Sequence, residues 1–175
     1  MEKNMKKFIS ILLIVLTLVA MTACQSSDPS GNGSNPTTAG NKEPKELVLS
    51  ETYTKITSAV QMPDMILIDD ADTLLDMFGI NIERTKQIQV YLCGNSLQAD
   101  EIWLIEATDA ENLAQLKQAA QNRLTAKDEE SVTYSPEQNA IVKKAHLATY
   151  GNYLVMIVSP NVDSIVDAFK TEAGV

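Results

Sequence analysis

The spacing of apolar residues in this chain changes repeatedly between a helical period and a strand period, which restricts the folds it can adopt. Apolar residues recur at helical spacing in four stretches, 47–61, 69–78, 108–124 and 160–170. Strand patterns occupy four other stretches, 87–92, 101–107, 144–150 and 153–158. The order is helix, helix, hairpin, helix, hairpin, helix. It predicts an α+β fold, a two-layer sandwich in which helices pack mainly on one face of an antiparallel sheet of about four strands in two hairpins.

Short local signals mark the ends of several of these elements. Gly79 matches a left-handed cap at the end of the second helix. Thr108 and Glu111 have the spacing of a capping box, which predicts the start of the long third helix. The dipeptide at 151–152 is Gly-Asn, which suits a two-residue hairpin turn. The apolar run at 65–68 is interpreted as a link across the edge of the core.

The segment 101–107 is expected to be the most buried strand. Ile102 and Leu104 face one side of it, and Trp103 and Ile105 face the other. Because both faces carry large apolar side chains, the sequence predicts a central strand that is covered, at least in part, on both faces.

The first 24 residues have the organisation of a lipoprotein signal peptide. Lys3, Lys6 and Lys7 form a basic start, an almost unbroken apolar run follows over 8–20, and small residues lead to Cys24. This exit resembles the lipobox of bacterial lipoproteins, in which the cysteine thiol is acylated and the cysteine becomes the new N-terminus. We therefore expect a lipid on Cys24 that holds the protein at the extracytoplasmic face of the cell membrane.

Two other interpretations of this segment stay open, a plain secretory signal and an uncleaved anchor. Met21 fits a secretory cleavage site badly, and it also departs from the lipobox, which more often has leucine there. The apolar run over 8–23 is shorter than the roughly 18 residues of a membrane span. The lipoprotein interpretation divides the chain into a signal peptide (1–23), the lipidated cysteine with a flexible Ser/Gly/Asn/Pro tether (24–46) and a single globular domain (47–175).

The acidic composition limits the classes of partner. The chain has 14 basic and 23 acidic residues, a net charge of −9, and removal of a signal peptide with three lysines and one glutamate leaves −11. Such a charge is repelled by phosphate backbones and anionic headgroups, so we expect no nucleic-acid partner. The expected partners are the membrane, through the lipid on Cys24, and an envelope protein or cell-wall component.

An ordered set of short motifs resembles a known family. The motifs lie at Leu75–Ile80, Gly94–Ala107, Tyr134–Glu137 and Gly151–Ser159. Together they resemble the bacterial lipoprotein family catalogued as domain of unknown function 4358, over nearly all of 47–170. The resemblance implies a small, lipid-anchored protein of Gram-positive bacteria. It transfers no site residue, because the family has no assigned activity.

The aspartates at 64, 69, 70, 72 and 76 are the most prominent charged cluster. They lack the spacing of a calcium loop, and three of them lie where a helix N-terminus favours negative charge. Helix capping is therefore preferred to a weak cation site. His146 is the single histidine, and no pair of cysteines accompanies it, so the sequence predicts no zinc site and no cofactor.

Tyr134, Tyr150 and Tyr153, with His146, form the candidate binding surface. Tyrosines near hairpin ends are common in recognition sites, although Tyr150 and Tyr153 can equally stack across their own turn. No phosphate loop, nucleophile elbow or other catalytic motif is present in the sequence. We therefore predict a non-catalytic binding module at the cell envelope. The alternative is a small envelope-associated enzyme with a site that the sequence does not reveal.

Overall fold

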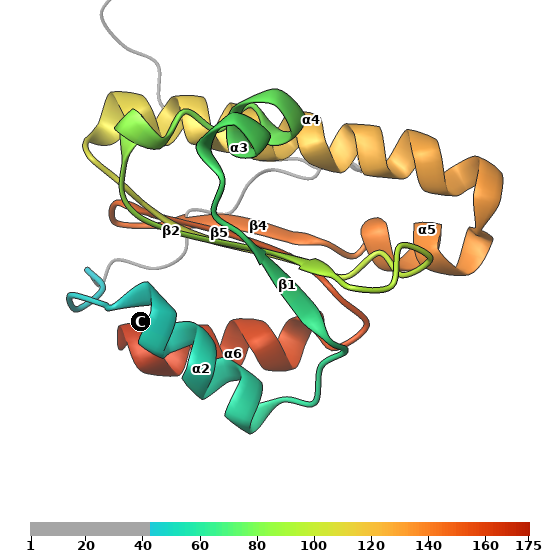
Figure 1. Ribbon diagram of the computed structural model, residues 1–175. Helices are drawn as coiled ribbons and strands as arrows, with labels where there is room; N and C mark the ends of the chain where they lie inside the picture. The colour runs from blue at the N-terminus through green and yellow to red at the C-terminus, as the bar shows by residue number, and fades with distance from the viewer. Residues whose placement is uncertain (1–42) are drawn as a thin grey trace, which may run out of the picture. The chain divides into compact units, whose positions relative to one another are not determined.

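Five antiparallel strands form the central sheet, in the order β1-β2-β3-β5-β4 (Figure 1). The computed structural model describes residues 43–175, all within one compact unit. The α+β class and the two hairpins are confirmed. A fifth strand is added because the apolar run at 65–68 pairs with the end of β2 instead of forming a link. The strands are β1 (Met65–Ile68), β2 (Thr85–Cys93), β3 (Glu101–Ala107), β4 (His146–Tyr150) and β5 (Tyr153–Val158).

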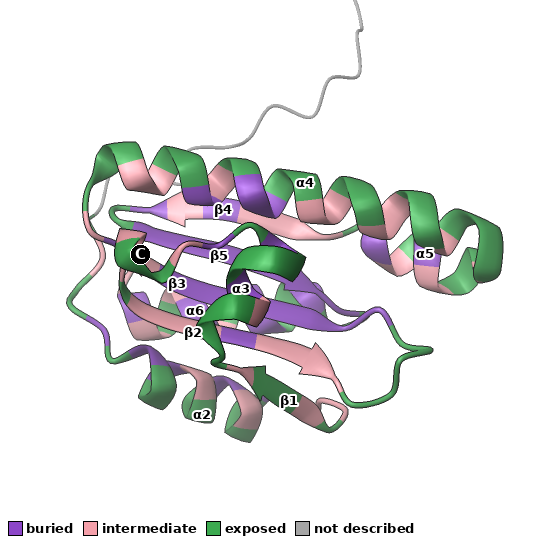
Figure 2. Ribbon diagram, turned by 45° about the horizontal axis from the view of Figure 1, so that its top comes forward, coloured by how far each residue is buried: buried purple, intermediate pink, exposed green. Residues whose placement is uncertain are grey.

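The middle strand, β3, is buried along almost its whole length, as Figure 2 shows. Its side chains divide between two separate apolar clusters. Ile102 and Leu104 belong to one cluster, and Trp103 and Ile105 belong to the other. The alternation in the sequence therefore predicted the position of this strand correctly.

Helices cover both faces of the sheet, which differs from the expected packing mainly on one face in two layers. α2 (Leu49–Ala59) and α6 (Val162–Ala173) lie on one side, and α3 (Ala71–Phe78) and α4 (Ala110–Tyr134) lie on the other (Figure 1). The physical reason is that β3 and β5 are apolar on both faces, so each face must be shielded from water. The arrangement has three layers.

The helix ends show how short-range hydrogen bonds fix the elements. Asp70 caps α3 by accepting a hydrogen bond from Thr73 N at 2.8 Å, and Gly79 ends it with φ 69°. The cap at Gly79 was predicted, and Asp70 is one of the two aspartates, 69 and 70, at which the sequence predicts the start of the helix. The capping box predicted for α4 is wrong, because Asp109 rather than Thr108 is the N-cap and accepts from Asn112 N. Aspartate is at least as good an N-cap residue as threonine, so Asp109 can take the capping position instead of its neighbour Thr108.

A short helix and a tight turn complete the chain after α4. The motif at Tyr134–Glu137 ends α4 and leads into the helix α5 (Pro136–Val142), which was not predicted, before β4 begins. The turn between β4 and β5 contains Gly151 with φ 54°, as the Gly-Asn pair predicted. A Cβ atom at Gly151 would also lie 3.0 Å from Pro44 Cδ, so glycine is required there for two reasons.

The predicted signal peptide, Cys24 and most of the predicted tether lie outside the described residues. Within residues 43–175, no helix has the length and apolar character needed to cross a membrane.

Candidate functional site

Two of the four predicted surface residues are buried in the core. Tyr150 and Tyr153 are 3% and 6% exposed, and they face each other as register partners across the hairpin turn. The Tyr153 hydroxyl accepts a hydrogen bond from Leu47 N at 3.1 Å, and the Tyr150 ring packs 5.2 Å from Phe169. Each ring therefore stabilises the hairpin and the helices beneath it, and neither offers a binding surface.

His146 is half-buried at the start of β4 and is bonded to one of these tyrosines. Its Nε2 atom lies 3.2 Å from the Tyr150 hydroxyl. Burial and the nearby Lys170 lower the pKa of His146, and Asp163 partly opposes this shift. The ring is therefore neutral near pH 7. Among residues 43–175 no serine or cysteine side chain is hydrogen-bonded to it, so the structure forms no catalytic pair around His146.

The aspartate cluster follows the capping interpretation. Hydrogen bonds from the hydroxyl and the backbone N–H of Thr73 lower the pKa of Asp70, which keeps this cap ionised. In the part of the chain that the structure describes, no three His, Cys, Asp or Glu side chains are arranged to hold a metal ion. Cys93 is a free thiol at the end of β2 that donates to Gln98 Oε1 at 3.1 Å.

Tyr134 lies apart from the other predicted residues, at the end of α4, and is 83% exposed. It lines an open groove of about 550 Å³ between the β2–β3 loop and the corner where α4 meets α5. This volume lies within the roughly 300–1,000 Å³ of small-ligand and side-chain pockets. The groove is lined by Ser96, Leu97, Gln98, Ala99, Lys127, Glu130, Ser131, Tyr134, Ser135, Gln138 and Val142.

The two walls of the groove are fixed by hydrogen bonds between them. Gln138 of α5 accepts from Ala99 N at 2.8 Å, which holds the β2–β3 loop against the helix. Ser135 caps α5 through its hydroxyl, which accepts from Gln138 N. Asn139 is buried and donates to the Asp128 carboxylate at 2.6 Å, which ties α5 to α4. The groove is therefore a fixed concave surface rather than a gap between loose segments.

A buried ion cluster lies beside the floor of the groove. Glu101 is fully buried and accepts from Arg123, with distances of 2.9–3.1 Å that include both carboxylate oxygens. Lys127 Nζ donates to it at 2.8 Å, and Trp103 Nε1 donates at 2.8 Å. The guanidinium also lies 5.0 Å above the Phe78 ring. One carboxylate thus neutralises one of two cations, and Lys127 carries positive charge to the groove surface.

The rim of the groove carries large apolar side chains that are mostly exposed to solvent. Leu97 is 81% exposed and Tyr134 is 83% exposed, the two highest values among the exposed large apolar side chains of the described residues. Ser131 and Ser135 are engaged with backbone groups and Asn139, and neither is hydrogen-bonded to a histidine or carboxylate that would act as a base. The arrangement suits the binding of an apolar or aromatic group with polar neighbours.

The family follows from a comparison of the whole sequence. The model of a domain of unknown function (DUF4358) matches residues 58–159. The chain belongs to the DUF4358 family. The segment that defines the family contains all five strands and every residue that lines the groove, and it leaves α6 outside. The chain matches no curated protein and no solved structure.

Sequence reasoning found one groove residue, Tyr134, and missed the others in this DUF4358 protein. Leu97 gave a usable signal, because it is the one large apolar residue in the otherwise polar loop after β2. Arg123 and Lys127 gave a second signal. Like charges four residues apart on one helix face repel each other, and a carboxylate placed between them relieves this repulsion. That carboxylate, Glu101, is on a strand and is identified only by the three-dimensional packing.

Proposed function

We propose that this protein is a lipid-anchored module on the extracytoplasmic face of the cell membrane, which binds a segment of another envelope protein in the groove at the α4–α5 corner. The observation that carries the binding role is the exposed pair Leu97 and Tyr134 on the rim of a concave, preformed surface. A soluble domain gains nothing by exposing two such side chains together, whereas a partner that covers them removes apolar area from water.

The groove supports a polypeptide occupant by its mixture of groups. Apolar contacts at Leu97 and Tyr134 would seat a large side chain, and wall groups not used within the domain, such as the Ser96 hydroxyl, would pair with a peptide backbone. Lys127 and Glu130 provide one charge of each sign, so the groove does not share the strong negative charge of the chain. A neutral or weakly charged segment therefore fits it best.

The lipid anchor is supported by the sequence alone. A basic start, a short apolar run and small residues before Cys24 are typical of a lipoprotein signal. The net charge of −9 is repelled by anionic lipids, so attachment would depend on the acyl chains. Two or more chains are needed for stable anchoring, because a single chain binds only marginally.

Replacing the predicted acylation site tests the anchor. In Cys24→Ala cells we expect the protein to leave the membrane fraction or to accumulate as the unprocessed precursor, because no thiol can accept the lipid. Fractionation followed by mass spectrometry of the N-terminal peptide measures both results. The matched control is Cys93→Ala, which removes the other thiol and is expected to leave membrane attachment unchanged. Equal membrane attachment of the two variants would contradict lipidation at Cys24.

Site-specific crosslinking in intact cells tests the groove. A photoreactive phenylalanine analogue at Leu97 is expected to give a protein adduct, and the same analogue at Val48, which precedes α2 and is 53% exposed, is expected to give none. The Leu97 adduct should fall by about tenfold when Tyr134→Ser is added, since an aromatic anchor commonly contributes about 1–2 kcal/mol to an interface. If the yield of the Leu97 adduct is unchanged by Tyr134→Ser, or if an adduct forms only from Val48, the partner binds elsewhere. Adducts to neither position would favour the enzyme alternative.

A further inference from the structure

The outer edge of β1 leaves backbone groups of the sheet without partners. Gly94 N donates to the Asp64 carbonyl at 2.8 Å, while the N–H of Cys93 donates toward β3 instead. Hydrogen-bonded and non-bonded pairs alternate in an antiparallel ladder. Met65, opposite Cys93, and Leu67 must therefore direct their N–H and C=O groups away from β2. No other strand of the described sheet lies beyond β1, so these groups face outward at a free edge.

The side chains of this edge are also apolar and accessible. Ile66 is 55% exposed and Leu67 is 39% exposed. Leu67 is the register partner of Tyr91, whose ring stacks on Tyr53 of α2 with centroids 3.5 Å apart. Strand β1 is short, with four residues, but it contains no lysine, no proline and no bulge, which are other features that prevent an edge from pairing. A strand added here would find backbone partners, and its side chains would meet apolar surface on both faces.

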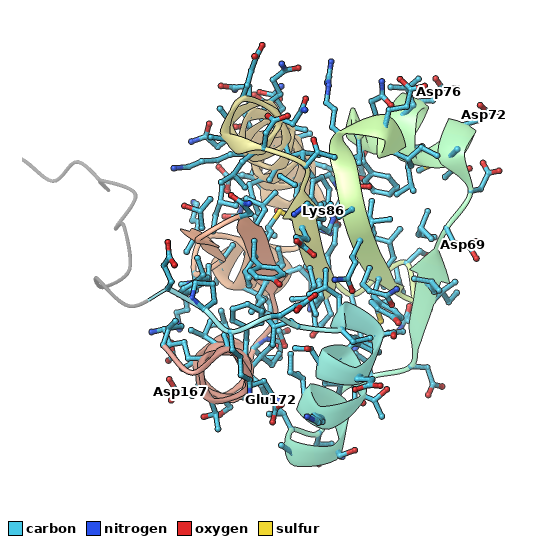
Figure 3. The ribbon with its side chains drawn as sticks, turned by 90° about the vertical axis from the view of Figure 1, so that its left-hand side faces the viewer. Asp69, Asp72, Asp76, Lys86, Asp167 and Glu172 are labelled. Carbon is cyan, nitrogen blue, oxygen red and sulfur yellow. The ribbon has the colours of Figure 1, made fainter. Side chains whose placement is uncertain are left out.

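Negative charge surrounds this edge without any positive charge in the same segment. Residues 61–82 contain five aspartates and no lysine, arginine or histidine. Asp69, Asp72 and Asp76 point into solvent along the side of the molecule that β1 and α3 form (Figure 3). A positively charged partner would therefore be attracted to the edge, and an acidic one would be repelled.

The same charges argue against a second copy of the chain as the occupant. Two β1 strands paired across a two-fold axis would be antiparallel, which would place Asp64 of one copy beside Asp69 and Asp70 of the other. Like charges opposite each other destabilise strand pairing. The aspartates thus disfavour pairing of β1 with β1 of a second copy, while a strand with basic ends can still pair with this edge.

We propose that the β1 edge binds an extended segment of a partner protein that adds a sixth strand to the sheet and carries lysine or arginine residues beside its apolar strand residues. The backbone of Met65 and Leu67 would supply the hydrogen bonds, and Ile66 and Leu67 would supply the apolar contacts, as in other cases of strand addition. This edge adjoins the α4–α5 groove at Gln98 of the β2–β3 loop, but its backbone and apolar groups are different ones, and the proposal does not depend on the function proposed for that groove.

Synthetic peptides with the full-length protein in detergent provide the test. One fluorescent peptide has alternating valine and threonine between paired lysines, and a second has glutamates in place of the lysines. A third keeps the lysines and has N-methyl groups on alternate amides, which removes its hydrogen bonds. We expect the lysine peptide to bind about tenfold more tightly than either of the others in fluorescence anisotropy, with the preference over the glutamate peptide shrinking as salt is added.

Variants of the protein locate the binding. Leu67→Pro removes an outward N–H and is expected to weaken binding of the lysine peptide by about tenfold or more. The double change Asp69→Asn and Asp72→Asn alters only exposed side chains, so folding is retained. It should weaken binding of the lysine peptide several-fold. Tyr134→Ser in the groove is the matched control and should leave binding unchanged.

Three outcomes would overturn the proposal. In the first, the lysine and glutamate peptides bind equally well. In the second, the double aspartate variant binds the lysine peptide as the unaltered protein does. In the third, sedimentation without peptide shows a dimer that Leu67→Pro dissociates, because a second copy would then occupy the edge. Support requires the amide signals of Met65 and Leu67 to shift in NMR spectra when the lysine peptide is added.

Discussion

Replacing Glu101 with glutamine is expected to lower the free energy of unfolding by about 3 kcal/mol, because it leaves two buried or half-buried cations without their counter-charge. The carboxylate is fully buried and is bonded to both Arg123 and Lys127. Glutamine has the same size but places an N–H donor group against these donors. The loss stays near the lower end of the range for broken buried pairs, since Arg123 and Lys127 keep 20% and 12% of their side-chain surface in water.

Urea denaturation measures this change, and the chain provides its own probe. Trp103 is the single tryptophan, and it donates to Glu101, so its fluorescence reports on the cluster as well as on global unfolding. Glu172→Gln is the control because Glu172 pairs with Lys55 on the surface, where ion pairs contribute little. If Glu101→Gln and Glu172→Gln have equal unfolding midpoints, the buried cluster does not stabilise the fold.

The cluster also connects stability with the proposed binding groove. Lys127 is held at the groove surface by its bond to Glu101, and the two residues lie on different elements, α4 and β3. Lys127→Met removes one cation but leaves the Arg123 pair intact, so it should destabilise the fold less than Glu101→Gln does. A loss of groove crosslinking in Lys127→Met without unfolding would then separate the binding role of the lysine from its structural role.

The parts of the fold that follow from local periodicity could be predicted from the sequence. Alternation in β3 identified both of its buried faces, and the Gly-Asn pair identified the turn before β5. Gly79 marked the end of α3 correctly, and the pair of aspartates at 69 and 70 marked its start. In each case the deciding interactions lie within a few residues along the chain, so the sequence pattern contains the information directly.

The parts that depend on contacts between distant segments could not be predicted in this way. The run at 65–68 has no period of its own, and it becomes a strand only because β2 extends far enough to pair with it. The groove exists because Ala99 and Gln138 are joined by a hydrogen bond, although they lie 39 positions apart. The sequence predicts helices mainly on one face, whereas β5 is buried at every position and therefore requires a covering layer on each face of the sheet.

The tyrosines show why residue type alone was a poor guide to the site. Tyrosine has a large apolar ring and a polar hydroxyl, so it serves in cores and in interfaces alike. Tyr153 is buried with its hydroxyl satisfied by Leu47 N, whereas Tyr134 is exposed at the end of a helix. Only the burial of each ring distinguishes the two roles, and burial is a property of the folded chain.

Replacing Trp103 with alanine is expected to have the largest effect of any single change considered, a loss of about 4 kcal/mol in the free energy of unfolding. The indole is fully buried in the middle of the sheet, and it meets the Phe78 ring edge-on with centroids 5.8 Å apart. Its removal leaves a cavity, and the Glu101 carboxylate loses the hydrogen bond that the indole N–H donates to it. Circular dichroism in urea measures the loss, since the variant has no tryptophan fluorescence.

Two further variants separate the cavity from the hydrogen bond. Trp103→Phe keeps most of the ring volume but removes the N–H donor, so we expect a loss of about 1–2 kcal/mol. Leu75→Ala is the control on α3, because Leu75 is 51% exposed and surface changes usually alter stability by less than about 0.5 kcal/mol. Because Trp103 and Glu101 share a hydrogen bond, the changes Trp103→Phe and Glu101→Gln should not add when combined. Additive losses would mean that the indole acts through packing alone, and the ion cluster would then be independent of the apolar core beside it.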